Sequence, residues 1–264
     1  MGLHFVERCA VEDEGDGPAV VCVHGLGGSG NTFAPLMTAL QRHRVVRIDL
    51  PGSGRSHRAE GALSMARYAD LVQSACARLN ITRAWFVGHS MGNIVLQHVA
   101  VAAPTLVAGL ALYGPLIAPP DAARTAIRAR GEKAKNEGAN GMHEIALALL
   151  NASISADTRA RLPLAVAYVR ESLMRQDPDG YARSCFALAD APAAAVEQIE
   201  APVLLVTGDE DVVAPPQAVR SMAEKLHRTR SVRVVVLPKC GHWTPVERPE
   251  ECARELRTFL DANR

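Results

Sequence analysis

The stretch Trp85-Phe86-Val87-Gly88-His89-Ser90-Met91-Gly92-Asn93-Ile94-Val95-Leu96 decides the fold. An apolar run is followed by small residues around Ser90 and then by apolar residues at helical spacing, which predicts a buried strand, a sharp turn and a helix. The pattern G-x-S-x-G is typical of a strained turn that projects its serine oxygen above a sheet, with the next backbone N–H directed at the same space. Short patterns recur by chance, so its value depends on what the rest of the chain supplies.

Length and composition narrow the possible classes of protein. The 264 residues suit one α/β domain with room for an insertion. Lys and Arg number 29 against 28 Asp and Glu, so the net charge of +1 gives no electrostatic reason to expect nucleic acid or an anionic membrane as a partner. The six cysteines lack C-x-x-C and metal-type spacings. We therefore expect reduced thiols, no metal and no cofactor.

The N-terminal sequence and the absence of long apolar runs bear on location. No basic-then-apolar signal sequence opens the chain, and no run approaches the length of a membrane span. With reduced thiols, this predicts a cytoplasmic protein, which we expect to be a monomer or a homodimer.

Strand and helix patterns alternate with short links before residue 118 and after residue 200. This rhythm predicts a doubly wound, mostly parallel α/β sheet. Between residues 118 and 200 only helical patterns occur, which predicts a helical cap inserted between two strands of a core formed by residues 1–117 and 201–264. Strands are expected at 3–11, 19–23, 45–50, 85–89, 110–113, 203–206 and 232–237, and helices at 31–43, 64–79, 121–136, 142–150, 164–174, 180–189, 217–226 and 249–260.

Three residues follow predicted strands in the order Ser90, Asp211, His242. Because the carboxyl ends of parallel strands share one edge of a sheet, these side chains are expected to meet as a catalytic triad. A serine hydroxyl is a weak nucleophile until a base takes its proton, a role expected of His242, with Asp211 fixing the imidazole tautomer. Asp209 and Glu210 compete with Asp211, which is favoured because it lies four residues before Pro215.

The loop His24-Gly25-Leu26-Gly27-Gly28-Ser29-Gly30 follows a buried strand. It lacks the lysine of a phosphate-binding P-loop and the spacing of a dinucleotide fingerprint. We expect an oxyanion hole formed by the backbone N–H groups of Leu26 and Met91, although an ordinary tight turn is the alternative for this loop. His24 is expected to brace the loop and His89 to pack beneath it.

Candidates for substrate contacts are Gly25, Trp243 and Arg124. Trp243 follows the candidate base. Its position is equally compatible with a role in lining the pocket and with plain packing in the core. Arg124 or Arg128 is a candidate for holding a substrate carboxylate, but their i, i+4 spacing favours a solvated helix face.

Five segments of the sequence form a recognisable set: His24-Gly25, Asp49–Ser56, Gly88–Gly92, Gly208–Asp211 and Gly241-His242. Together they resemble the α/β-hydrolase superfamily, and the resemblance covers essentially the whole chain. Three further segments, Gln176–Ala182, Ala187–Ala189 and Cys240–Trp243, resemble the 3-oxoadipate enol-lactonase and carboxylesterase group within it. The resemblance implies hydrolysis of a small lactone that bears a carboxylate.

The expected function is therefore hydrolysis of a small carboxylic ester or lactone by a serine enzyme, through an acyl-enzyme intermediate. Serine rather than aspartate at position 90 argues against the dehalogenases and epoxide hydrolases of this fold. Two alternatives remain: a C–C bond hydrolase, and a small-molecule receptor with slow turnover that acts through its cap. Neither can be separated from the main hypothesis by motifs, because all retain the triad.

Overall fold

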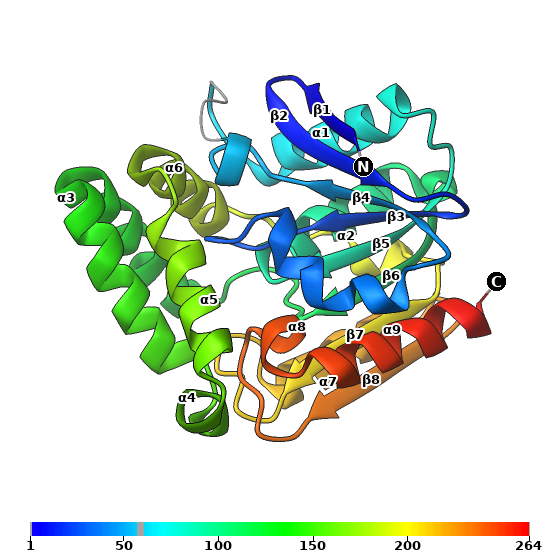
Figure 1. The fold of residues 1–264 in the computed structure, drawn as a ribbon. Coiled ribbons are helices and arrows are strands. Elements are labelled where there is room, and N and C mark those ends of the chain that lie inside the picture. The colour runs from blue at the N-terminus through cyan, green and yellow to red at the C-terminus, as the bar shows by residue number, and fades with distance from the viewer. Residues whose placement is uncertain (1, 57–60, 264) are drawn as a thin grey trace.

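An eight-stranded sheet forms the centre of the structure, a computed structural model that describes residues 2–56 and 61–263 (Figure 1). The strand order is β1-β2-β4-β3-β5-β6-β7-β8, with β1 and β2 antiparallel, β2 and β4 antiparallel, and all other neighbours parallel. The mostly parallel sheet predicted from the sequence is confirmed. The strands are β1 (Gly2–Val6), β2 (Cys9–Glu14), β3 (Ala19–Val23), β4 (Arg44–Ile48), β5 (Ala84–His89), β6 (Val107–Tyr113), β7 (Val203–Gly208) and β8 (Val232–Leu237).

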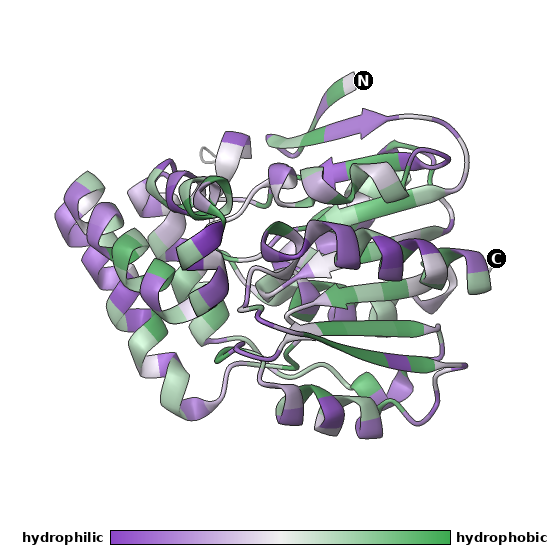
Figure 2. Cartoon of the chain, turned by 60° about the horizontal axis from the view of Figure 1, so that its bottom comes forward, coloured by the Kyte–Doolittle hydropathy of each residue, from purple (hydrophilic) through white to green (hydrophobic). Residues whose placement is uncertain are grey.

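Helices cover both faces of the sheet because successive side chains of a strand point to opposite sides. Val21 and Val23 of β3 lie on the face of the sheet that α1 (Met65–Arg78), α2 (Met91–Ala102) and α7 (Pro216–Lys225) cover. Val20 and Cys22 face the other way, toward the 3₁₀ helix η1 (Gly30–Ala39) and α9 (Pro249–Ala262). Figure 2 shows this arrangement as hydrophobic strands between helices that turn hydrophilic residues outward. Shorter elements are η2 (Gly54–Ser56), η3 (Pro104–Leu106), η4 (Val196–Gln198) and α8 (Thr244–Glu247).

Four α-helices and the 3₁₀ helix η4 occupy the fully described interval between β6 and β7, and the four α-helices gather at one end of the sheet (Figure 1). We call them the cap helices: α3 (Asp121–Ser153), α4 (Ala156–Arg161), α5 (Pro163–Met174) and α6 (Pro178–Ala189). The helices expected at 121–136 and 142–150 are both part of α3, which bends at Gly138, and α4 was not predicted. The division into a core and a separate cap unit at residues 118 and 200 stays a prediction.

Two local expectations were wrong. The single strand expected at 3–11 is a hairpin of β1 and β2, joined by Glu7 and Arg8, which both adopt positive φ angles (47° and 66°). Neither residue type signals such a turn, so the apolar pattern concealed it. The helix expected at 31–43 is the 3₁₀ helix η1, which contains Pro35, a residue without the N–H that an α-helix needs.

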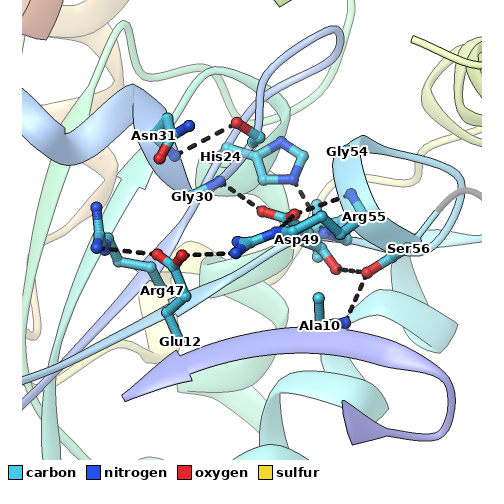
Figure 3. A network of polar contacts seen from close by, with 12 residues as sticks. Ala10, Glu12, His24, Gly30, Asn31, Arg47, Asp49, Gly54, Arg55 and Ser56 are labelled. Atoms are coloured by element: carbon cyan, nitrogen blue, oxygen red, sulfur yellow. Dashed lines mark hydrogen bonds and ion pairs between the residues drawn. The ribbon is translucent and has the colours of Figure 1, made fainter. Parts of the chain in front are cut away.

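A buried polar network holds the loops after β3 and β4 together (Figure 3). Asp49 accepts hydrogen bonds from the Gly30 N–H (2.7 Å) and from the Arg55 N–H and Nε (3.0 and 2.7 Å). Arg55 also pairs with Glu12, which in turn pairs with Arg47. Burial would raise the pKa of Asp49, but the hydrogen bond from Arg55 and the other donors outweigh it and lower the pKa. Asp49 is therefore a structural anion.

His24 braces the loop in the way that the sequence predicted. Its Nε2 accepts the Leu50 N–H (2.9 Å), so Nδ1 carries the proton and donates to the Gly25 carbonyl (2.7 Å). Only a neutral imidazole can make both bonds, and burial lowers its pKa accordingly.

Among the described residues, no helix is both long and apolar enough to cross a membrane.

The substitution Asp49→Asn is expected to lower the free energy of unfolding by about 2–3 kcal/mol near neutral pH, because it removes the charge that Arg55 and two backbone N–H groups satisfy. The folded-state pKa of Asp49 lies below its ordinary 3.8, so this stabilisation is complete above that pH and is lost as pH falls through the folded value. Urea unfolding curves recorded at decreasing pH test this. The difference in free energy of unfolding between wild type and variant must narrow below about pH 4. A gap independent of pH would contradict the assignment.

Candidate active site

Ser90 occupies a strained turn between β5 and α2. Its φ of 52° and ψ of −120° are rare for a residue with a side chain, and its N–H donates to the Tyr113 carbonyl (3.0 Å). Gly92 allows this turn to sit against the neighbouring strand, because a Cβ there would lie 2.1 Å from the Val23 carbonyl oxygen. The predicted strand, turn and helix are thus present, and the turn leads from the carboxyl end of a central strand.

The structure brings Ser90, Asp211 and His242 together from three separate loops. His242 Nε2 lies 2.8 Å from Ser90 Oγ, and His242 Nδ1 lies 2.9 Å from Asp211 Oδ2. The Asp211 Oδ1 atom accepts the N–H groups of Val213 and Ala214, both at 2.8 Å. Burial would raise the pKa of Asp211, but its contact with His242 and these donors outweigh it and lower the pKa. Asp211 is therefore held as an anion against the imidazole.

The two acidic neighbours of Asp211 have other partners. Asp209 accepts the Cys240 N–H at 3.1 Å, and Glu210 accepts the Ala156 N–H at 2.9 Å. Within the described ranges, no group of three His, Cys, Asp or Glu side chains is placed to hold a metal ion. The geometry therefore separates Asp211 from the alternatives that the sequence left beside it.

Leu26 and Met91 lie beside Ser90 in the wall of one cavity. Met91 is the first residue of α2, where backbone N–H groups have no partner within the helix. Within the part of the chain that the structure describes, the Leu26 N–H donates no hydrogen bond. Gly25 lies behind the serine, since a Cβ on it would come within 2.7 Å of the Ser90 Cβ. Both residues therefore border the cavity beside Ser90, with Gly25 allowing the close approach, and the oxyanion hole expected from the sequence stays a prediction.

The cavity above Ser90 measures about 230 Å³ and is mostly apolar. Of its described lining residues, Arg130 is the sole Lys, Arg, Asp or Glu, and none of the described carboxylates pairs with it. Ala123, Ile127 and Arg130 follow one another at helical spacing on the face of α3 that meets the cavity. Sequence analysis missed Arg130, although this i, i+4, i+7 pattern was the signal that could have found it.

The other predicted substrate contacts have mixed outcomes. Trp243 lines the cavity and packs against His89 with ring centroids 5.2 Å apart. Arg124 lies outside the lining: its guanidinium donates to the Ala189 and Ala191 carbonyls at the end of α6. Arg128 pairs with Asp190. The expectation that Arg124 contacts substrate is therefore wrong, because backbone carbonyls of the cap already occupy it.

His89 packs beneath the turn, as expected. Its Nε2 donates to the His242 carbonyl (3.0 Å), and burial, with the nearby His242, lowers its pKa to about 3. A neutral His89 therefore supports the loop that carries His242.

Comparison with known proteins adds the family to this geometry. A family described by the alpha/beta hydrolase fold matches residues 18–249. The chain belongs to the α/β-hydrolase family.

Three similar proteins are named as an esterase, an enol-lactonase and a hydrolase. A thermophilic esterase from Thermogutta terrifontis, solved with malate bound, is 26% identical with a TM-score of 0.89, covering 97% of this chain and 93% of its own. The enol-lactonase from Burkholderia xenovorans LB400 is also 26% identical, with a TM-score of 0.87, covering 98% of this chain and all of its own. The (E)-2-((N-methylformamido)methylene)succinate hydrolase of Acinetobacter baylyi is 23% identical over 250 residues, 94% of this chain and 92% of the relative. The resemblance to esterases and enol-lactonases is confirmed.

We expect Asp211→Asn to slow the reaction of Ser90 with diethyl p-nitrophenyl phosphate by about 10³–10⁴-fold, because the imidazole loses the anion that fixes its tautomer. Asp209→Asn is the matched control, and it should slow the reaction by less than about tenfold because it weakens a single backbone contact. Release of p-nitrophenolate measures both. Equal losses of reaction rate in the two variants would show that Asp211 affects the reactivity of Ser90 no more than Asp209 does.

Proposed function

We propose that this α/β hydrolase cleaves a small carboxylic ester or lactone, with Ser90 as nucleophile and an acyl-enzyme as intermediate. The observation that carries the proposal is the 2.8 Å contact between His242 Nε2 and Ser90 Oγ at the floor of the cavity. A base at this distance can take the hydroxyl proton as the oxygen attacks a carbonyl carbon.

The first half of the reaction forms the acyl-enzyme. Ser90 Oγ bonds to the carbonyl carbon, its proton passes to His242 Nε2, and the carbonyl oxygen becomes an oxyanion facing the Leu26 and Met91 N–H groups. The tetrahedral intermediate then expels the alkoxy oxygen, which receives the proton from His242. In a lactone this oxygen stays attached to the acyl chain as a hydroxyl or enol.

The second half releases the acid. Water gives a proton to His242 and attacks the acyl carbon, and the collapse of the second tetrahedral intermediate returns the proton to Ser90 Oγ. The Asp211 carboxylate stabilises the imidazolium formed in both halves, which its contact with Nδ1 and its lowered pKa support.

The position of Arg130 favours a substrate that carries a carboxylate. A guanidinium in an apolar cavity without a neighbouring acid favours an anionic ligand group, and can hold a carboxylate by two parallel hydrogen bonds. It lies beside the Tyr181 hydroxyl, on the cap side of the cavity. Among the relatives, one is named for a succinate derivative and another was solved with malate bound. An ester or lactone with a carboxylate a few atoms from the scissile bond fits these observations.

Ser90→Ala is expected to reduce hydrolysis of short p-nitrophenyl esters and of an enol-lactone by at least about 10³-fold, since it removes the hydroxyl that His242 Nε2 contacts. Burst and steady-state rates measure it, and the better substrate separates esterase from lactonase. A burst without turnover in the wild type would favour the receptor alternative. Full activity in the variant would refute the mechanism.

Arg130→Gln is expected to raise the KM for mono-p-nitrophenyl adipate by roughly 10–100-fold, while the KM for p-nitrophenyl hexanoate changes less than about threefold. The two esters match in chain length and differ in the terminal carboxylate. Arg128→Gln, on the same helix but paired with Asp190 outside the cavity, is the control and should change neither value. Equal effects on both esters would remove the case for a carboxylate subsite.

A further inference from the structure

Glu247 is a buried acid that the reaction sequence above does not use. It ends α8, five residues after His242, and only 1% of its surface is exposed. A carboxylate removed from water at this depth needs hydrogen-bond donors around it, because burying an unsatisfied charge is costly. The partners of Glu247 therefore indicate what it does.

Those partners are three backbone N–H groups. The Oε2 atom accepts from Gly241 (3.0 Å) and from Ser155 (2.9 Å), and the Oε1 atom accepts from Trp243 (3.1 Å). Gly241 and Trp243 are the residues on either side of His242, whereas Ser155 precedes α4 of the cap. The Glu247 side chain thus accepts hydrogen bonds from the backbone on both sides of His242 and from the backbone of the cap.

The cap also contacts the backbone of His242 directly. The His242 N–H donates to the Ser153 carbonyl at the end of α3 (2.7 Å), and Ser153 also lines the cavity. Gly241 permits this contact, because a Cβ there would lie 2.5 Å from the Ser153 oxygen and 2.9 Å from Glu247 Oε1. The junction of α3 and α4 therefore rests directly on the backbone of the base, with no room for a side chain between them.

We propose that Glu247 is the positioning residue of His242 and that it couples the base to the α3–α4 junction of the cap. The inference rests on the proposed function, since it assigns Glu247 a role through the base named there. A carboxylate suits the place because it only accepts hydrogen bonds, and all three groups that face it are donors. A glutamine has the same shape, but turns an NH₂ group toward at least one of these N–H groups.

The test compares Glu247→Gln with Glu250→Gln, which removes the same charge from the exposed first turn of α9. Glu247→Gln is expected to lower kcat for p-nitrophenyl acetate by about 10–100-fold and leave KM within about threefold, because a misplaced base slows the chemistry and leaves the cavity intact. Glu250→Gln should change neither. Rates are measured well below the Tm of each variant, so that loss of stability alone does not alter them.

Inactivation by diethyl p-nitrophenyl phosphate separates this inference from the proposed function. If the wild type is not phosphorylated at Ser90, the proposed function fails. If wild type and Glu247→Gln react equally fast, the function stands and the positioning role is refuted. Should the glutamine variant not fold, Glu247→Asp keeps the charge on a side chain one methylene shorter, which cannot reach all three donors. It must then show the same selective loss of kcat, and full kcat in it would equally refute the role.

Hydrogen exchange tests the coupling to the cap. In Glu247→Gln, amide exchange is expected to accelerate together in peptides covering 151–158 and 238–245, since both lose N–H contacts to the same carboxylate. Faster amide exchange in 238–245 alone would show that Glu247 does not link the cap to the base, and would overturn the coupling.

Discussion

The close approach of α2 to β3 is the constraint on which the rest of the site depends. Gly92 lets the first turn of the helix lie against the Val23 carbonyl, and this contact forces Ser90 into its strained backbone conformation. The strain is tolerated because the turn is fixed from both sides, by the Tyr113 carbonyl on the Ser90 N–H and by packed strands beneath it. The result is a hydroxyl held above the sheet at the edge where all the other loops converge.

Three buried carboxylates fix loops at this edge by accepting backbone N–H groups. Asp49 holds Gly30 and Arg55, Asp211 holds Val213 and Ala214, and Glu247 holds both neighbours of His242. Loops carry unsatisfied donors, and charge-assisted bonds to a buried anion are stronger than neutral ones. Rigid loops at the edge of the sheet therefore come from a small number of acids, of which Asp211 alone also faces the reacting groups.

The sheet and the meeting of Ser90, Asp211 and His242 could be predicted from the sequence because each rests on a local pattern: an apolar run, a glycine turn, or a polar residue directly after a strand. Prediction failed where no residue type signals the local structure, and where the decisive contact is long-range. Glu7 and Arg8 form a tight turn without a residue type that signals one, and Arg124 is taken up by carbonyls some 65 residues away. Glu247 looks like one of several acids before a C-terminal helix, and only the fold shows Ser155 beside it.

The cap helix α3 serves both binding and chemistry, at different places along its length. Before its bend at Gly138 it presents Arg130 to the cavity, and after the bend its last residue, Ser153, accepts the His242 N–H. Under the proposed function, the charge of Arg130 in the first part selects the ligand through a side chain, which is free to change with the substrate. The second part acts through the backbone, which any sequence that keeps the helix end in place can supply. Substrate preference in this chain can therefore vary along the first half of α3 without disturbing the base, because the two are joined through main-chain atoms and Glu247.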